Sequence, residues 1–213
     1  MNIKLREPVN GFTHFIGIIF AVTALVNLLN RPGQLSARHT FSFTVFGVAM
    51  ILLYLSSTLY HWLPLEGKRL ELFRKIDHIM IFIFIAACYT PVCLITLRGP
   101  WGNWILVAAW AIAIGGFFVK IFWLNAPRVL STSLYLMMGW MIVIALWPLF
   151  KHPSAKGLLI WLGVGGFFYT VGAVIYAVKK PNPWPGVLGF HEIFHLFILA
   201  GSFANYWMVY HYV

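Results

Sequence analysis

The sequence predicts an all-α integral membrane protein, a single seven-transmembrane helix bundle that occupies residues 1–213. Of the 213 residues, 61% are hydrophobic and only 9% are charged, whereas a soluble domain carries about 25% charged residues. The apolar residues are gathered into seven runs, each long enough to cross a hydrocarbon core about 30 Å thick. The connections between the runs are short, so we expect no second domain.

The predicted spans follow one another with breaks at charged residues, glycine or proline. They are 12–29, 41–63, 76–97, 101–124, 132–150, 158–178 and 187–210. The first run is full length and lacks a small-residue cleavage site, so it is interpreted as a span and not as a cleaved signal peptide. The basic segment 65–75 is expected to be a solvated loop. Glycines in the fourth and sixth runs indicate close helix packing.

The basic residues predict an orientation. The chain has 15 Lys and Arg residues against five acidic ones, and a formal net charge of +10. The basic residues lie almost entirely between the spans, which is typical of residues that anchor a membrane protein. The positive charge is therefore not interpreted as a sign of nucleic-acid binding. Ten lie on the side of the N-terminus and five on the other side. The positive-inside rule therefore places the N-terminus in the cytoplasm and the C-terminus outside.

A pair of histidines, His191 and His195, lies inside the last span. An ionisable residue at that depth is costly without a partner, so it marks a functional site. The i, i+4 spacing puts both imidazoles on one helix face about 6 Å apart, in reach of one cation. In the predicted orientation His61, which ends the second span, and Asp77, which begins the third, lie in the same leaflet. Three imidazoles from two helices are a known catalytic zinc set, with the fourth position left for water.

Two further side chains are predicted to act on that water or on the substrate. Asp77 could bind the water or the metal, or orient a histidine, and it is the natural general base. Ser57 lies four residues before His61 on the same helix face, so its hydroxyl is predicted to donate a hydrogen bond to a developing oxyanion.

Accessory residues come from the first span and from the histidine pair itself. Glu7, Asn10 and His14 form a polar stripe, which either caps the helix and meets the interface or lines the entrance of a cavity. The string His-Glu-Ile-Phe-His at 191–195 also matches the zincin signature, with Glu192 as the candidate base of an intramembrane metalloprotease. Such a protease needs a further ligand, and His211 lies about 24 Å along the helix, out of reach.

Four strings carry a resemblance to a known family: EPVNGFTHFIG at 7–17, SSTLYH at 56–61, KIDHIMIFIFIAACYTP at 75–91 and HEIFHLFILAGSFANY at 191–206. In their order and spacing they resemble the hemolysin III family, the bacterial relatives of the PAQR (progestin and adipoQ receptor) proteins. The resemblance implies a multi-pass protein of the bacterial plasma membrane with an inward N-terminus. It implies zinc held by His61, His191 and His195, with Asp77 on the water and Ser57 close by. Glu192 departs from the pattern of the receptors, which carry a neutral residue there.

Three functions follow as hypotheses. The first is a zinc-dependent hydrolase that cleaves a lipid amide or ester at the cytoplasmic leaflet; relatives are placed among membrane hydrolases, and the receptor branch is associated with ceramide hydrolysis. The alternative is a metal-stabilised sensor of membrane lipid without turnover. A lytic pore would need a continuous polar lining, and the spans offer too few polar residues for one. In each case the expected partner is a membrane lipid, while the oligomeric state stays open.

Overall fold

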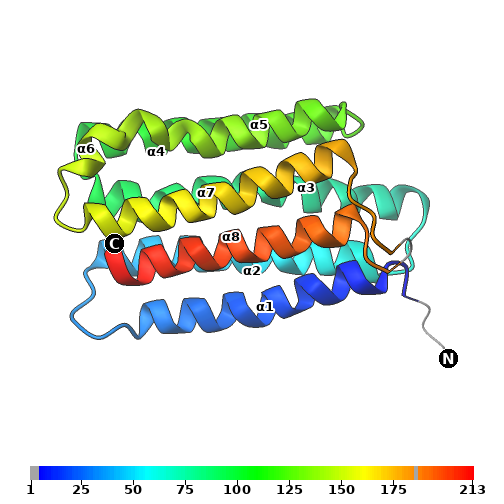
Figure 1. Ribbon diagram of the computed structural model, residues 1–213, viewed down its shortest axis with the longest axis horizontal. Helices are drawn as coiled ribbons and strands as arrows, with labels where there is room; N and C mark the ends of the chain where they lie inside the picture. The colour runs from blue at the N-terminus through cyan, green and yellow to red at the C-terminus, as the bar shows by residue number, and fades with distance from the viewer. Residues whose placement is uncertain (1–4, 185–186) are drawn as a thin grey trace.

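The computed structural model describes residues 5–184 and 187–213, and within these residues seven helical segments are long and apolar enough to cross a membrane. They run side by side as an elongated bundle (Figure 1). The predicted all-α, seven-span fold is therefore confirmed.

The spans are α1 (Pro8–Leu29), α2 (Ala37–Trp62), α3 (Gly67–Pro91) continued by the π-helical η1 (Val92–Thr96), α4 (Pro100–Phe122), a fifth span made of three pieces, α7 (Ala155–Val178) and α8 (Phe190–Tyr212). The three pieces of the fifth span are α5 (Arg128–Trp140), the 3-10 turn η2 (Met141–Ala145) and α6 (Leu146–Phe150).

The expectation of a solvated loop at 65–75 was wrong, because α3 already begins at Gly67. Hydropathy marks where a helix enters the membrane and not where the helix starts. The first turns of α3 carry charges at helical spacing, and Lys75 Nζ lies 3.3 Å from Glu71 Oε1 at i, i+4. Each such pair stabilises a helical turn by about 0.2–0.5 kcal/mol.

The third and fifth spans lose regular α geometry at neighbouring points. Pro91 has no N–H to donate, and the π-helical turn η1 follows directly after it. The Tyr89 hydroxyl donates to the Met138 carbonyl oxygen at 2.7 Å and accepts from the Ile142 amide at 3.0 Å. The hydroxyl therefore satisfies backbone groups at the change from α5 to the 3-10 turn η2, where regular pairing stops.

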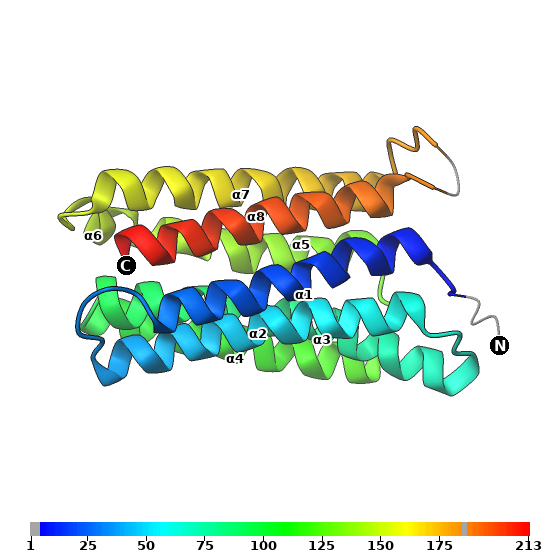
Figure 2. The same ribbon diagram turned by 90° about the horizontal axis from the view of Figure 1, so that it is seen from below.

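Helix contacts close a ring around the interior of the bundle. The order round the ring is α1, α2, α3, α5, α7, α8 and back to α1, while α4 packs on α3 from outside (Figure 2). Close packing at glycine is found at Gly172, where an added Cβ would lie 2.9 Å from the Phe197 Cβ on α8. Gly163 and Gly166 instead line the interior cavity.

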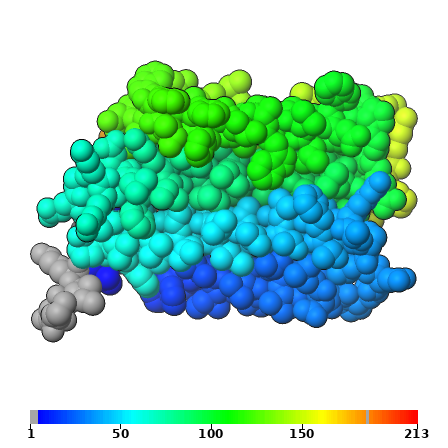
Figure 3. Space-filling view, turned by 180° about the vertical axis from the view of Figure 1, so that it is seen from behind, coloured from blue at the N-terminus to red at the C-terminus, as the bar shows by residue number. Residues whose placement is uncertain are grey.

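The outer surface of the ring is apolar, as a lipid-facing surface must be. Large hydrophobic side chains are exposed along its length, among them Ile19, Val22, Phe41, Ile114 and Phe118. Figure 3 shows one such face, over which α1, α2 and the helices that follow lie side by side.

The bundle has two chemically different ends. The helices α1, α3, α5 and α8 begin at one end of the bundle, where α2, α4 and α7 finish, and we call this end the N-terminal end. The C-terminus of α8 lies at the opposite end (Figure 1). His61, Asp77 and His191 all belong to the N-terminal end, as the topology predicted. The assignment of this end to the cytoplasm depends on the count of basic residues and stays a prediction.

Candidate metal centre

The three predicted ligand histidines meet in one cluster. His61 comes from the last turn of α2, and His191 and His195 from the first two turns of α8. Each offers one ring nitrogen, and these nitrogens lie within 4.8 Å of one another. The ring centroid of His61 lies 5.0 Å from those of His191 and His195, which are themselves 4.7 Å apart. The cluster can therefore hold a single metal ion.

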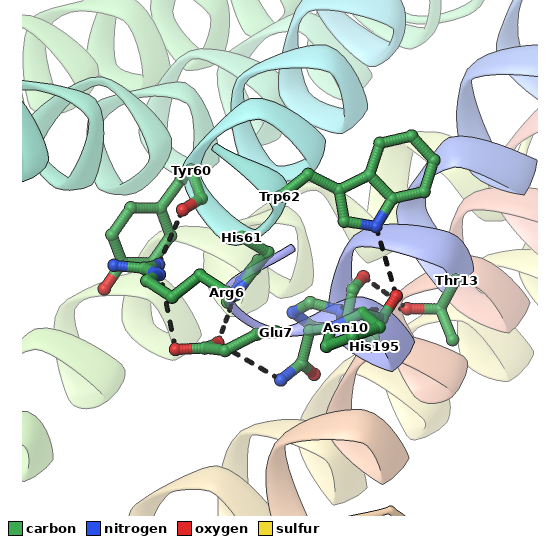
Figure 4. Close-up of polar contacts among 9 residues, drawn as sticks. Arg6, Glu7, Asn10, Thr13, Tyr60, His61, Trp62 and His195 are labelled. Carbon is green, nitrogen blue, oxygen red and sulfur yellow. Dashed lines mark hydrogen bonds and ion pairs between the residues drawn. The ribbon is translucent and has the colours of Figure 1, made fainter. Parts of the chain in front are cut away.

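One ring nitrogen of His61 is already committed and the other is free. Its Nδ1 lies 2.5 Å from Glu7 Oε2 (Figure 4). Its Nε2 is buried and has no hydrogen-bond partner among the residues that the structure describes. With the Nδ1 proton donated to the carboxylate, the Nε2 lone pair points away from Glu7. Metal-binding histidines almost always have this arrangement, because the second nitrogen fixes the tautomer and orientation of the ring.

His195 is held in a similar way by the first turns of α1. Its Nδ1 lies 3.2 Å from the Asn10 carbonyl oxygen and 3.1 Å from Thr13 Oγ1, and Thr13 Oγ1 itself donates to the Asn10 carbonyl at 2.8 Å. The Nδ1–H therefore donates to the backbone of α1, and Nε2 is left as the metal-binding atom.

Glu7 has a role that the sequence reasoning missed. Of its two predicted roles, capping of α1 is not found, because its side chain makes no capping bond, whereas Glu7 does line the cavity. It contacts His61 twice, because the Glu7 amide also donates to the His61 carbonyl at 2.9 Å. Asn10 Nδ2 donates to Glu7 Oε2 at 3.3 Å and Arg6 Nη2 lies 3.7 Å from Glu7 Oε1 (Figure 4). The hydrogen bond from His61 lowers the pKa of the Glu7 carboxyl below its ordinary value. The spacing of Glu7, Asn10 and His14 on one helix face was the available signal.

His14 lies beside the cluster with both nitrogens uncommitted. Its side chain is 4% exposed, and neither Nδ1 nor Nε2 has a hydrogen-bond partner in the part of the chain that the structure describes. Its ring stacks on that of His195 and lines the interior cavity. A polar ring in this position can bind a group that enters the cavity.

Asp77 and Ser57 lie on the wall of the same cavity as His191 and His195. The Ser57 hydroxyl is buried beside the Asp77 carboxylate. Among the described residues the group that could hold a metal consists of His61, His191 and His195, and Asp77 is not part of it. Asp77 instead lines the cavity together with His191 and His195.

Glu192 points elsewhere. Its Oε2 accepts a hydrogen bond from the Gly189 amide at 2.8 Å, which closes the N-terminus of α8. This contact uses the carboxylate in the manner of a capping-box glutamate.

The cavity has a volume of about 560 Å³ and reaches from the histidines far toward the opposite end of the bundle. Its wall is polar near Asp77 and His191 and apolar near Leu146, Phe150 and Met208. Its volume is typical of a small-molecule site, and it combines an apolar body with a few polar groups at one end.

Comparison with known proteins agrees with this architecture. The family described as haemolysin-III related matches residues 3–206. The chain is 41% identical to hemolysin-3 of Bacillus cereus over 212 residues, which cover 98% of this chain and 92% of that protein. It is 40% identical to the hemolysin-3 homolog of Bacillus subtilis (strain 168) over 205 residues, 96% and 92% of the two chains. It is 23% identical to the adiponectin receptor protein of Drosophila melanogaster over an alignment of 241 positions, which covers 94% of this chain and 49% of that one. These matches confirm the resemblance inferred from the four sequence strings, and the chain belongs to the haemolysin-III-related family of multi-pass membrane proteins.

Proposed function

We propose that this protein is a zinc-dependent hydrolase that cleaves an amide or ester bond of a membrane lipid at the N-terminal, cytoplasmic end of the bundle. The observation that carries the proposal is the position of the histidine cluster. His191 and His195 line one end of a cavity of about 560 Å³ whose wall is apolar toward Leu146 and Phe150. The ring centroid of His61 lies 5.0 Å from those of both, so the three imidazoles meet at this end. A lipid that fills this cavity presents its acyl–headgroup linkage at the depth of the cluster.

The donor set fits zinc. Imidazole suits this metal, and catalytic zinc sites have three protein ligands with one position left open. His61 Nε2, which is buried and has no partner in the described part of the chain, is one of the three ligand atoms, and the other two come from His191 and His195. A zinc ion held there supplies Lewis acidity, which polarises a carbonyl and lowers the pKa of water.

The residues of the chain supply orientation and proton transfer. Glu7 and the Asn10 carbonyl hold His61 and His195 in the tautomers that leave Nε2 free. Asp77, on the cavity wall, accepts a proton from the attacking water and returns it to the leaving amine or alcohol. The Ser57 hydroxyl, beside Asp77, donates a hydrogen bond to the oxygen on which negative charge develops.

Zinc content and turnover, measured on the same purified protein, test this proposal. Wild type is expected to hold one equivalent of zinc by elemental analysis and to hydrolyse at least one member of a panel of N-acyl and O-acyl lipids. Asp77→Asn is expected to keep the zinc and the fold and to lose turnover by about 10²–10⁴-fold, the usual contribution of a general base. Stoichiometric zinc with no turnover on the whole panel, or full turnover by Asp77→Asn, would contradict the proposal.

A lipid sensor without turnover is the second candidate, and one observation favours it. The cluster and its supporting contacts join α1, α2 and α8 at one point, as a structural staple would. A sensor should bind lipid and zinc with no product, and Asp77→Asn should leave both properties unchanged. For the protease hypothesis, the use of the Glu192 carboxylate by Gly189 is unfavourable.

A further inference from the structure

A second polar group lies on the cavity wall, apart from the histidines. It consists of Arg74 on α3, Lys120 on α4 and Arg128 at the start of α5, all of which line the cavity. All three charges lie close enough to act electrostatically on the imidazole of His78, which is on the same wall. We call these three residues the basic cluster.

Lys120 is the unusual member of the basic cluster. A lysine near the end of a membrane helix normally extends its ammonium group toward the interface and water. The Lys120 side chain instead turns inward and is only 2% exposed, and its Nζ donates to Ser131 Oγ at 2.7 Å. An ammonium group has three donors, so the contact with Ser131 leaves two donors of this cavity-lining side chain for another partner.

Asp77 lies on the same cavity wall, but among the described residues no acidic side chain forms an ion pair with the basic cluster. All five acidic residues lie within 5–184 and 187–213. Glu7 is engaged by Arg6 and His61, and Glu71 by Lys75. Because a buried charge is costly unless it is paired, the basic cluster is suited to an anion that comes from outside the chain.

The two arginines are held in place by contacts that leave most of their donors free. Arg128 stacks over the Tyr176 ring, with 4.4 Å from its Cζ to the centroid, and its Nη1 donates to the Tyr176 carbonyl at 3.2 Å. Arg74 Nη1 donates to Asn125 Oδ1 at 3.2 Å. A guanidinium group carries five N–H donors in a planar fork that matches phosphate oxygens. Nδ1 of His78, on the same wall, is also buried and has no hydrogen-bond partner within residues 5–184 and 187–213.

We propose that Arg74, Lys120 and Arg128 form an anion-binding subsite that takes the phosphate of an anionic membrane phospholipid, with the acyl chains of that lipid in the apolar part of the cavity. Arginine forks and a lysine point charge are the usual protein partners of phosphate. The subsite opens into an apolar cavity inside the bundle, which a lipid can fill and a hydrated free ion cannot. Binding here needs neither zinc nor turnover, so it goes beyond the proposed hydrolysis.

Burial distinguishes this subsite from the general attraction of surface lysines to anionic headgroups. Lys75 offers a matched control, because it lies at the same end of the bundle and carries the same charge but pairs with Glu71 on the outside of α3. If only surface charge mattered, neutralising Lys75 and neutralising Lys120 would have equal effects.

The test is native mass spectrometry of the purified full-length protein with phosphatidylglycerol or with diacylglycerol of the same acyl chains, which lacks the phosphate. Wild type and Lys75→Met are expected to retain phosphatidylglycerol in preference to diacylglycerol. Lys120→Met and Arg128→Gln are expected to lose about tenfold of that preference, the equivalent of one charge-assisted hydrogen bond. Lys120→Arg should keep it. If Lys120→Met fails to fold, the same lipid preference is measured for Arg74→Gln.

Two competition arms identify the ligand. Inorganic phosphate that displaces phosphatidylglycerol at equal concentration would overturn the assignment to a lipid, and oleate that does so would overturn the assignment to a phosphate. Equal lipid preference in wild type, Lys120→Met and Arg128→Gln would overturn the subsite itself. This experiment measures lipid binding and not turnover. The anion-binding subsite is therefore tested even if the protein hydrolyses no lipid.

Discussion

The imidazole of His14 lies flat against that of His195, with 3.6 Å between the ring centroids and 11° between the ring planes. Two protonated rings would repel each other at this distance, so the arrangement suits neutral imidazoles, which is also the form that binds a metal ion. One helix of the bundle, α1, thus covers a ligand ring with His14, while Asn10 of the same helix and Glu7, which directly precedes it, contact ligand nitrogens.

Variants of His14 should separate its stacking from its hydrogen bonding. We expect His14→Phe to keep the zinc, because a phenyl ring of similar shape can still cover His195. Turnover should fall about tenfold, because the cavity loses a polar partner for the substrate worth roughly 1.4 kcal/mol. The measurement is steady-state hydrolysis beside zinc content. Loss of zinc together with turnover in His14→Phe would show that the ring acts on the metal site and not on the substrate.

Removing the carboxylate that orients His61 should weaken metal binding. Glu7→Ala is expected to lower zinc affinity about 10–100-fold, the usual effect of losing the partner of a metal-binding histidine. Competition with a chelator of known affinity measures it. Glu71→Ala is the control, because the exposed Glu71 pairs with Lys75 and contacts none of the three ligand histidines. Equal zinc affinity in the two variants would contradict the role given to Glu7.

Zinc should stabilise the fold through α2 and α8. Chelation is expected to lower the Tm of wild type and readdition of zinc to restore it, since a ligand that binds only the folded state stabilises it by about 2.7 kcal/mol at a hundredfold excess over Kd. His61→Ala should bind no zinc and show no response to chelator. His211→Ala should behave as wild type, because His211 is on α8 at the opposite end of the bundle. A Tm of wild type that ignores chelator would argue against a metal at this cluster.

Two adjacent glycines on α4 should differ in their tolerance of alanine. A Cβ at Gly116 would lie 2.5 Å from atoms of the Phe82 ring, which is buried, whereas a Cβ at Gly115 would meet nothing within 4 Å. Gly116→Ala is therefore expected to cost about 1–3 kcal/mol of stability through overpacking, and Gly115→Ala to be close to neutral. Thermal unfolding in detergent compares the two, and a similar loss of stability in both would refute the packing of α4 on α3.

Much of the site follows from the sequence because a membrane simplifies the problem. Runs of about 20 apolar residues must cross as helices, so the order of the spans alone decides that His61, Asp77 and the His191–His195 pair share one end of the bundle. The i, i+4 spacing then predicts that the pair faces one cation.

Other features depend on how each helix is rotated about its axis and on which neighbour it contacts. Nothing local in the sequence distinguishes Lys120, buried on the cavity wall, from Lys75, paired outside on α3, and nothing local shows that Glu7 bonds to a histidine 54 positions away. Hydropathy along the chain reports only the free energy of entering the bilayer. Rotation and partner choice are decided by side-chain packing and hydrogen bonding between spans distant in sequence, and for this reason only the tertiary structure revealed the network around His61 and the basic cluster.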